Sequence, residues 1–149
     1  MTNLAAARAI IERVRGAGAT DFCVCGGSRN APLIAVLGTA NVFSFVDERS
    51  AAFFALGRTK RDGKPVAVIT TSGTAAAELL PATIEAYYSG APLVLITADR
   101  PARFRGTGAP QSIEQPGLFG VYATTDFNGW NRRTPLHINI EFDEPLIDE

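Results

Sequence analysis

Apolar residues recur along this chain in two patterns, one typical of amphipathic helices and the other of buried strands. Between residues 4 and 15, apolar side chains return every three or four positions with charged residues between them. This spacing predicts a helix that ends at Gly16-Ala17-Gly18. Residues 66–70 instead form an uninterrupted, mostly β-branched run, as expected for a strand that is covered on both faces.

Strands and helices predicted in this way alternate at regular spacing. The predicted strands are residues 21–25, 42–46, 66–70, 93–97 and 136–140, and further helices are expected over 31–37, 49–61 and 75–88. Residues 118–123 fit either a short helical piece or the start of a strand. The alternation predicts an α/β fold, with a three-layer, mostly parallel sheet that has helices on both faces and right-handed crossovers.

Composition and charge narrow the classes of function. The 149 residues fit one domain, and a net charge of −1 with no basic stripe argues against a nucleic acid or an acidic membrane surface as partner. No apolar run is long enough to span a bilayer, and the N-terminus lacks the pattern of a secretory signal, so we expect no membrane insertion. A single His leaves no zinc-binding set.

The only two cysteines, Cys23 and Cys25, lie in one predicted strand. Alternation along a strand leads us to expect their side chains on opposite faces, where the two thiols do not pair. We read both as buried, reduced core residues, which suits a cytoplasmic protein.

A carboxylate stands where the second predicted strand gives way to a helix. Glu48 follows the strand and begins the helix, where unpaired amides favour a negative charge by about 0.3–1 kcal/mol. A charged first turn is one interpretation. The other is a carboxylate at the edge of a cleft, because open parallel sheets bind ligands at the carboxyl ends of their strands.

Other polar segments are expected at the same edge of the sheet. The loops 26–30, 47–49 and 71–74 each follow a predicted strand, and the long Gly- and Pro-containing loop that begins at Asp99 brings several arginines. Arginine suits the bidentate capture of carboxylates. The sequence therefore predicts one cleft that holds a carboxylate, several guanidinium groups and two helix starts.

Five blocks of sequence resemble one enzyme family. They are Gly-Gly-Ser-Arg-Asn-Ala-Pro-Leu (26–33), Asp-Glu-Arg-Ser-Ala-Ala-Phe-Phe-Ala-Leu-Gly (47–57), Thr-Ser-Gly-Thr-Ala-Ala-Ala (71–77), Thr-Ala-Asp-Arg-Pro (97–101) and Gly-Ala-Pro-Gln-Ser-Ile-Glu-Gln-Pro-Gly-Leu-Phe-Gly (108–120). Together they resemble the thiamine-diphosphate-dependent 2-succinyl-5-enolpyruvyl-6-hydroxy-3-cyclohexene-1-carboxylate synthases of menaquinone synthesis. The resemblance covers nearly the whole chain, but only the family's N-terminal, pyrimidine-binding domain. We therefore expect residues 1–149 to be that single domain, with the middle and diphosphate-binding domains absent from this chain.

The resemblance implies roles for individual residues. Glu48 matches the glutamate that hydrogen-bonds the aminopyrimidine ring of thiamine diphosphate and favours the tautomer that takes the proton from the thiazolium carbon. The residues implied at the pyrimidine pocket are Thr71, Ser72 and Gly73, and those implied in substrate binding are Ser28, Arg29, Arg100 and Gln111. Capping of the following helices is the plainer interpretation of Ser28, Thr71 and Ser72.

The resemblance also implies an activity and partners. The family decarboxylates 2-oxoglutarate and adds the resulting carbanion to isochorismate, which makes it a transferase and a carboligase. The Mg²⁺ or Mn²⁺ that holds the diphosphate is expected in the missing domain, because the Gly-Asp-Gly plus Asn pattern is absent here. We expect that domain to come from a second subunit of a homo-oligomer, a dimer or tetramer, and the chain alone to be inactive.

Two departures and two alternatives accompany the resemblance. Cys25-Gly26 stands where the family usually has Ser-Pro, and Thr124–Arg133 is shorter than the usual helix-bearing segment. The final residues 143–149 resemble the family's boundary before its middle domain. The alternatives are the pyrimidine domain of another thiamine-diphosphate carboligase or decarboxylase, and a non-catalytic α/β binding module.

Overall fold

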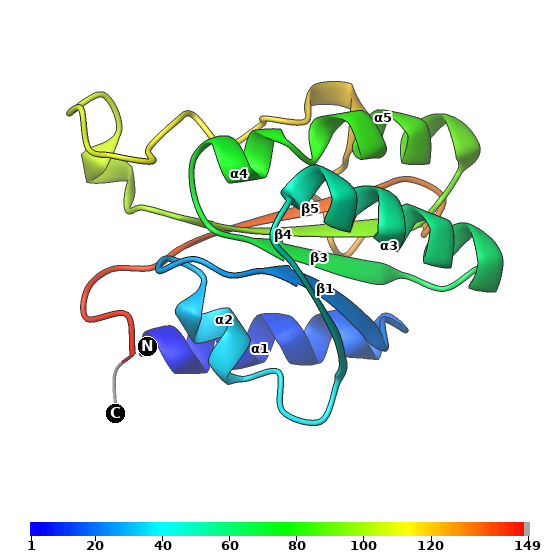
Figure 1. The fold of residues 1–149 in the computed structure, drawn as a ribbon, viewed down its shortest axis with the longest axis horizontal. Helices are drawn as coiled ribbons and strands as arrows, with labels where there is room; N and C mark the ends of the chain where they lie inside the picture. The colour runs from blue at the N-terminus through cyan, green and yellow to red at the C-terminus, as the bar shows by residue number, and fades with distance from the viewer. Residues whose placement is uncertain (148–149) are drawn as a thin grey trace.

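The computed structural model describes residues 1–147, which form one all-parallel sheet between two layers of helices (Figure 1). The sheet has the order β2-β1-β3-β4-β5. Its strands are β1 (Asp21–Cys25), β2 (Asn41–Phe45), β3 (Val66–Thr70), β4 (Leu93–Asp99) and β5 (Leu136–Glu141). The α/β fold and all five strands predicted from the sequence are confirmed, although β2 lies one residue earlier and β4 continues through Asp99. Residues 148–149, the end of the expected domain boundary, lie outside the described residues.

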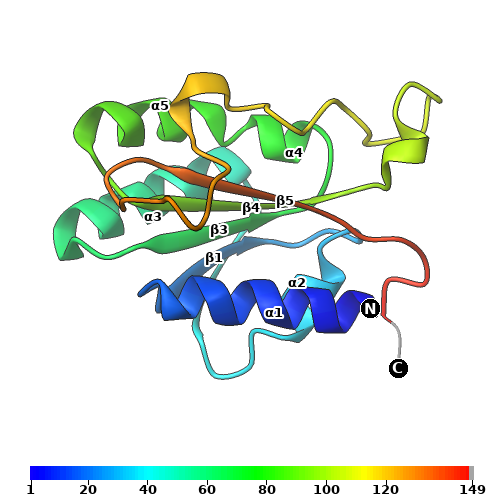
Figure 2. The ribbon, with the colours of Figure 1, turned by 180° about the vertical axis from the view of Figure 1, so that it is seen from behind.

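Helices cover both faces of the sheet, as the two views in Figures 1 and 2 show. The helices α1 (Asn3–Gly16) and α2 (Ala31–Ala35) lie on one face, and α3 (Glu48–Asp62), α4 (Thr74–Ala77) and α5 (Leu80–Ser89) lie on the other. Two short 3-10 helices, η1 (Ala102–Phe104) and η2 (Gly120–Tyr122), interrupt the segment between β4 and β5. Among residues 1–147, no helix combines the length and apolar character needed to cross a bilayer.

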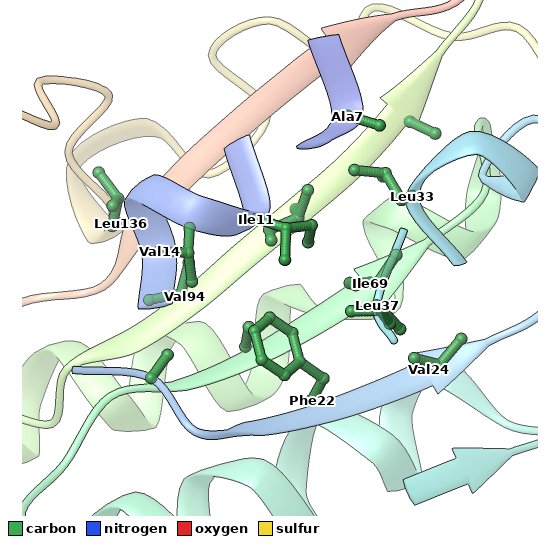
Figure 3. Packing of buried hydrophobic residues seen from close by; sticks show 14 of the residues in the cluster. Ala7, Ile11, Val14, Phe22, Val24, Leu33, Leu37, Ile69, Val94 and Leu136 are labelled. Carbon is green, nitrogen blue, oxygen red and sulfur yellow. The ribbon is translucent and has the colours of Figure 1, made fainter. Parts of the chain in front are cut away.

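Each face of the sheet has its own hydrophobic core. Figure 3 shows the core under α1 and α2, where Ile11 and Val14 pack with Phe22 and Leu33. The second core lies under α3 and α5 and contains many small residues of those helices, such as Ala52 and Ala55. Small side chains allow these helices to approach the sheet closely, so the strands between the two cores are buried on both sides.

The two cysteines confirm one expectation and correct another. Both are buried and unpaired, as predicted. The expectation of opposite faces was wrong, because residues two positions apart on a strand share a face, and both cysteines belong to the core under α3 and α5. Burial is the main reason why the pKa of each thiol is raised to about 12, which keeps both protonated at neutral pH.

The single helix predicted over residues 75–88 is two helices in the structure. Helix α4 ends at Ala77, and α5 begins at Leu80 with Pro81 in its first turn. Proline has no amide hydrogen to continue the bonding of a preceding helix but fits the first turn of a new one. The helix predicted over 31–37 is shorter, and it ends at Ala35.

The short stretch before β5 is folded against the outer strand of the sheet. The predicted alternatives for residues 118–123 resolve into η2, after which Thr124 pairs with β5 through a single parallel bridge. Beyond it, Asp126 accepts hydrogen bonds from the amides of Asn128 and Gly129 in a tight turn. Trp130, which packs on the core under α1, donates its indole N–H to the Thr134 carbonyl at 2.7 Å.

An ion pair joins the amino end of the sheet to α3. Arg58 donates its Nε to the Oδ2 of Asp21 at 2.6 Å, and Asn41 of β2 donates to the other oxygen at 3.1 Å. Burial by itself raises the pKa of the Asp21 carboxyl, but the hydrogen bonds from Asn41 and Arg58 and the guanidinium charge outweigh it, so this pKa is lowered. A carboxylate with a lowered pKa in the folded state stabilises the fold above its unfolded pKa, and that stability is lost as the pH falls through the folded pKa.

We predict that Asp21→Asn lowers the free energy of unfolding at pH 7 by about 1–3 kcal/mol, because Arg58 loses a buried partner. Urea unfolding at several pH values measures this, and the difference from wild type should shrink below about pH 4. The matched control is Glu85→Gln, whose exposed pair with Lys60 should contribute less than about 1 kcal/mol. Equal losses of unfolding free energy in the two variants would contradict a larger stabilising role for the Asp21–Arg58 pair.

Candidate functional site

The loops that follow the strands meet at the carboxyl edge of the sheet, on the left in Figure 1. The loop after β1 and the loop after β3 are in direct contact there. A Cβ placed on Gly27 would lie 2.6 Å from the Cβ of Thr71, which is closer than side-chain atoms approach one another. The predicted segments 26–30 and 71–74 therefore form one continuous surface, as expected for an open parallel sheet.

A buried asparagine holds the loop after β1. The Asn30 side chain donates to the Cys25 carbonyl at 2.8 Å and accepts from the Gly27 amide at 2.9 Å. Sequence reasoning gave Asn30 no role, although an asparagine three residues after a glycine pair is a common turn residue. The capping proposed for Ser28 is not seen. Its carbonyl, not its hydroxyl, accepts from Ala31, and its exposed side chain is left at the surface.

Glu48 is the first residue of α3, and its carboxylate is available to a ligand. The neighbouring Asp47 caps the helix by accepting from the Ser50 amide at 2.7 Å. Glu48 itself is half-buried and makes no hydrogen bond or ion pair with residues 1–147. Phe45, three residues before Glu48, pairs with Cys25 at the end of β1, so α3 begins next to the carboxyl end of β1. Burial is the main cause of the raised pKa of the Cys25 thiol, and the Glu48 carboxylate raises it further.

The turn after β3 is buried and has a special backbone conformation. Thr71 and Ser72 are buried, and Gly73 has a φ of +83°, which favours glycine. Neither side chain caps α4, because Gly73 occupies the cap position and no side-chain bond is present there. The hydroxyl of Thr70, just before the turn, is buried without a hydrogen-bond partner, as is that of Ser112 in the facing loop. These unpaired polar atoms fit a surface that receives a polar ligand.

The loop after β4 packs against this turn. A Cβ on Gly73 would lie 3.0 Å from the backbone of Gln111, so the two segments touch. Gln111 has a φ of +52° and an exposed side chain. The fully buried Gln115 accepts a hydrogen bond from the Gly73 amide at 2.7 Å. Sequence reasoning did not single out Gln115, since nothing in a loop sequence marks which glutamine turns inward.

The four arginines of the predicted cleft differ in their partners. Arg29 is buried and donates to the Phe142 carbonyl at 2.9 Å, and to Glu144 at 3.3 Å. Arg103 pairs with Asp143, and Arg105 pairs with both Asp99 and Glu141. Within residues 1–147, only Arg100 of the four has no carboxylate partner.

Arg100 is held near the turn while its charge stays unpaired. Its Nε donates to the Pro110 carbonyl at 2.9 Å, one residue before Gln111. Arg29 and Arg103 instead tie the loops after β1 and β4 to the chain that leaves β5, and Arg105 ties the loop after β4 to the last residues of β4 and β5. Of these arginines, Arg100 is therefore the one that can meet an incoming carboxylate without giving up an ion pair within residues 1–147.

A cavity of about 450 Å³ lies elsewhere. It follows the outer edge of β5, between Ile10 and Arg13 of α1 and the short stretch around Phe127, and none of the predicted site residues lines it. A surface that forms a single wall of a cleft encloses little volume, so the converging loops remain the candidate site. Residues 1–147 contain no cluster of three His, Cys, Asp or Glu side chains that could hold a metal ion.

Comparison with known proteins identifies the family. Residues 4–118 match the family described as thiamine pyrophosphate enzyme, N-terminal TPP binding domain. A 2-succinyl-5-enolpyruvyl-6-hydroxy-3-cyclohexene-1-carboxylate synthase from Bdellovibrio bacteriovorus is 46% identical over 162 residues, covering 99% of this chain and 31% of the relative. Synthases of the same name from Akkermansia muciniphila and Corynebacterium diphtheriae are 52% and 49% identical, covering 86% and 87% of this chain and 27% of each relative.

The chain thus spans about a third or less of the length of these relatives. The matched residues include Glu48, the turn after β3 and most of the loop that packs on it. The resemblance inferred from the five sequence blocks is confirmed, and neither alternative is favoured. This chain belongs to the family of N-terminal thiamine-pyrophosphate-binding domains of thiamine pyrophosphate enzymes.

Proposed function

We propose that this chain is the pyrimidine-binding, N-terminal domain of a 2-succinyl-5-enolpyruvyl-6-hydroxy-3-cyclohexene-1-carboxylate synthase. The observation that carries the proposal is the unpaired carboxylate of Glu48 at the start of α3, three residues after Phe45, which pairs with Cys25 at the end of β1. The name shared by relatives that cover most of this chain supports the same assignment. The corresponding reaction joins decarboxylated 2-oxoglutarate to isochorismate, so the complete enzyme is a transferase that acts as a carboligase.

The residues present fit one end of thiamine diphosphate. Glu48 would hydrogen-bond a ring nitrogen of the aminopyrimidine, and the buried turn of Thr71, Ser72 and Gly73 would line the ring's pocket. When bound, the cofactor supplies the carbanion chemistry of the reaction. The Glu48 carboxylate can accept a proton and return it at that ring nitrogen, because no residue of the described chain competes for it.

The substrates are carboxylates, and two arginines of the site can meet them. Arg100 offers an unpaired guanidinium beside the loop that carries Gln111, and Ser28 offers an exposed hydroxyl. Arg29 can take part by exchanging partners. Its bond to the Phe142 carbonyl is buried, but the Glu144 side chain is 71% exposed, so a substrate carboxylate can replace Glu144 at little cost.

The rest of the active site is proposed to come from another domain. The Mg²⁺ or Mn²⁺ that holds the diphosphate would be bound there, as would the diphosphate itself. Apolar side chains on the α3 and α5 side, Phe53, Tyr88 and Val121, are 41%, 74% and 76% exposed and fit a contact surface. We propose a cytoplasmic homo-oligomer, a dimer or tetramer, in which the diphosphate-binding domain of a second subunit faces this surface.

Glu48→Gln in the complete enzyme should lower kcat at least about 100-fold, because the amide cannot take up and return a proton. The change is nearly isosteric, so the circular dichroism spectrum and melting temperature should stay close to those of the wild type. Glu12→Gln, on the exposed side of α1, is the control and should leave kcat unchanged. Wild-type turnover in Glu48→Gln would exclude the proposed role.

Replacing Arg100 or Arg103 should affect substrate binding differently. Arg100→Met in the complete enzyme should raise KM for a carboxylate substrate by about 10–100-fold, the range expected for losing a charge-assisted hydrogen bond. Arg103→Met removes a neighbouring charge that already pairs with Asp143, and should change KM less than about threefold. Equal effects on KM would show that general electrostatics, and not a contact with Arg100, governs substrate binding.

The 149-residue protein by itself should not turn over substrate. Incubation with 2-oxoglutarate, isochorismate, thiamine diphosphate and Mg²⁺ should release no carbon dioxide above background, because the residues proposed here bind only the pyrimidine end of the cofactor. Sustained release of carbon dioxide would contradict the proposed division of the site between domains.

A further inference from the structure

A chain of buried and partly buried hydrogen bonds runs from the ends of β4 and β5 to the turn after β3. Gln115 is its central member, with 0% of its surface exposed. The Gln115 Oε1 accepts from the Gly73 amide at 2.7 Å, and its Nε2 donates to the Ala98 carbonyl at 3.2 Å and to the Asn139 Oδ1 at 2.8 Å. One side-chain amide therefore hydrogen-bonds groups from the turn after β3, from β4 and from β5.

The direction of each hydrogen bond in this chain is fixed by its neighbours. The carboxylate of Asp99 can only accept, so Asn139 must present its Nδ2 to it, at 2.9 Å. The Oδ1 of Asn139 is then turned toward Gln115, which must present its own Nε2. This leaves the Gln115 Oε1 facing the Gly73 amide, which can only donate.

The end at Asp99 is itself held in place. Arg105 donates to the Asp99 Oδ2 at 3.0 Å, and the Arg100 amide donates to the other oxygen at 2.8 Å. Thr97 adds a second donor to the Asn139 Oδ1 at 2.7 Å, so the orientation of that amide does not depend on Gln115 alone. The orientation of the Gln115 amide is therefore set by Ala98 and Asn139 on the sheet, and not by the loop that carries it.

Gly73 is the residue that connects this chain of hydrogen bonds to the predicted cofactor site. Its φ of +83° gives the turn its shape, and its α-carbon lies against the backbone of Gln111. The Gln115 side chain holds the Gly73 amide by a hydrogen bond, and the backbone of Gln111 packs against the Gly73 α-carbon. Loss of that bond would free the turn at the point where three segments of the predicted site meet.

We propose that Gln115 is a positioning residue of the cofactor site. It holds Gly73, and thereby the conformation of residues 71–73, in the geometry that receives the aminopyrimidine, a role that rests on the proposed function. Only a side chain with an acceptor and a donor on one planar group satisfies both neighbours. Gln115→Met removes both kinds of bond at similar length, and Gln115→Glu keeps an acceptor for Gly73 but, when ionised, has no proton for Ala98 or Asn139.

The first test needs no cofactor. Hydrogen exchange measured by NMR on the 149-residue protein should show the Gly73 amide exchanging at least about tenfold faster in Gln115→Met than in the wild type. The matched control is Trp130→Phe, which removes one hydrogen bond to the Thr134 carbonyl, in a different part of the fold. In that control the Gly73 amide should exchange no faster than the change in global stability requires.

The second test measures the affinity for thiamine diphosphate by titration calorimetry at pH 7.5, using the complete enzyme with Mg²⁺. Gln115→Met and Gln115→Glu should each weaken binding by about tenfold, the loss of one well-formed interaction. Trp130→Phe should bind as the wild type does, even with an equally lowered melting temperature. The KM for 2-oxoglutarate at saturating cofactor should stay within about twofold in all variants, since Gln115 touches no proposed substrate residue directly.

The outcomes separate the two proposals. Unchanged exchange of Gly73 in Gln115→Met would overturn the positioning role, as would wild-type cofactor affinity in both Gln115 variants. If Gln115→Met does not fold, Gln115→Glu decides by cofactor affinity, because its carboxylate keeps an acceptor for the Gly73 amide. Absence of cofactor binding by the wild-type enzyme would instead overturn the proposed function, and the Gly73 exchange rate would still show whether Gln115 holds the turn.

Discussion

The contact between the loop after β1 and the loop after β3 is the constraint on which the site depends. Gly27 and Thr71 approach so closely that no Cβ fits between them. The strands that carry these loops are neighbours in the sheet, so the strand order brings the loops to the same edge. A larger residue at position 27 would push the two loops apart, and the surface beside Glu48 would lose its continuity with the turn of residues 71–73.

Ion pairs explain why an arginine-rich cleft offers so few free charges. Three of its arginines bind carboxylates at the ends of β4 and β5 or in the chain that leaves β5, and so fix the loops that they belong to. Counting arginines in the sequence overestimates the positive charge available to a ligand, because the partner carboxylates lie about 36 to 115 positions away in the chain for most of these pairs. The sequence gives the residue types, but the pairing depends on where β5 ends.

Hydrophobic periodicity predicted the sheet and its two helical layers well, because three of the strands, β1, β3 and β4, are buried along their whole length. The split between α4 and α5 could have been read from Pro81, whose missing amide hydrogen breaks the pattern. The shared face of Cys23 and Cys25 follows from strand geometry and was misjudged, whereas their lack of pairing was foreseen. Placement of Glu48 at the start of α3 was predictable, since acidic residues are favoured where a helix begins.

The roles of the buried polar side chains in the candidate site could not be predicted from the sequence. Asn30 and Gln115 look like ordinary loop residues, yet each one bridges the backbone of a site loop to another segment. Asn30 also explains how the loop keeps its conformation with Cys25-Gly26 where the family usually has Ser-Pro. It bonds the residues on either side of Gly26, while a Cβ on Gly26 would meet nothing within 4 Å. The conformation of that loop is thus fixed by the asparagine and does not require the ring of a proline.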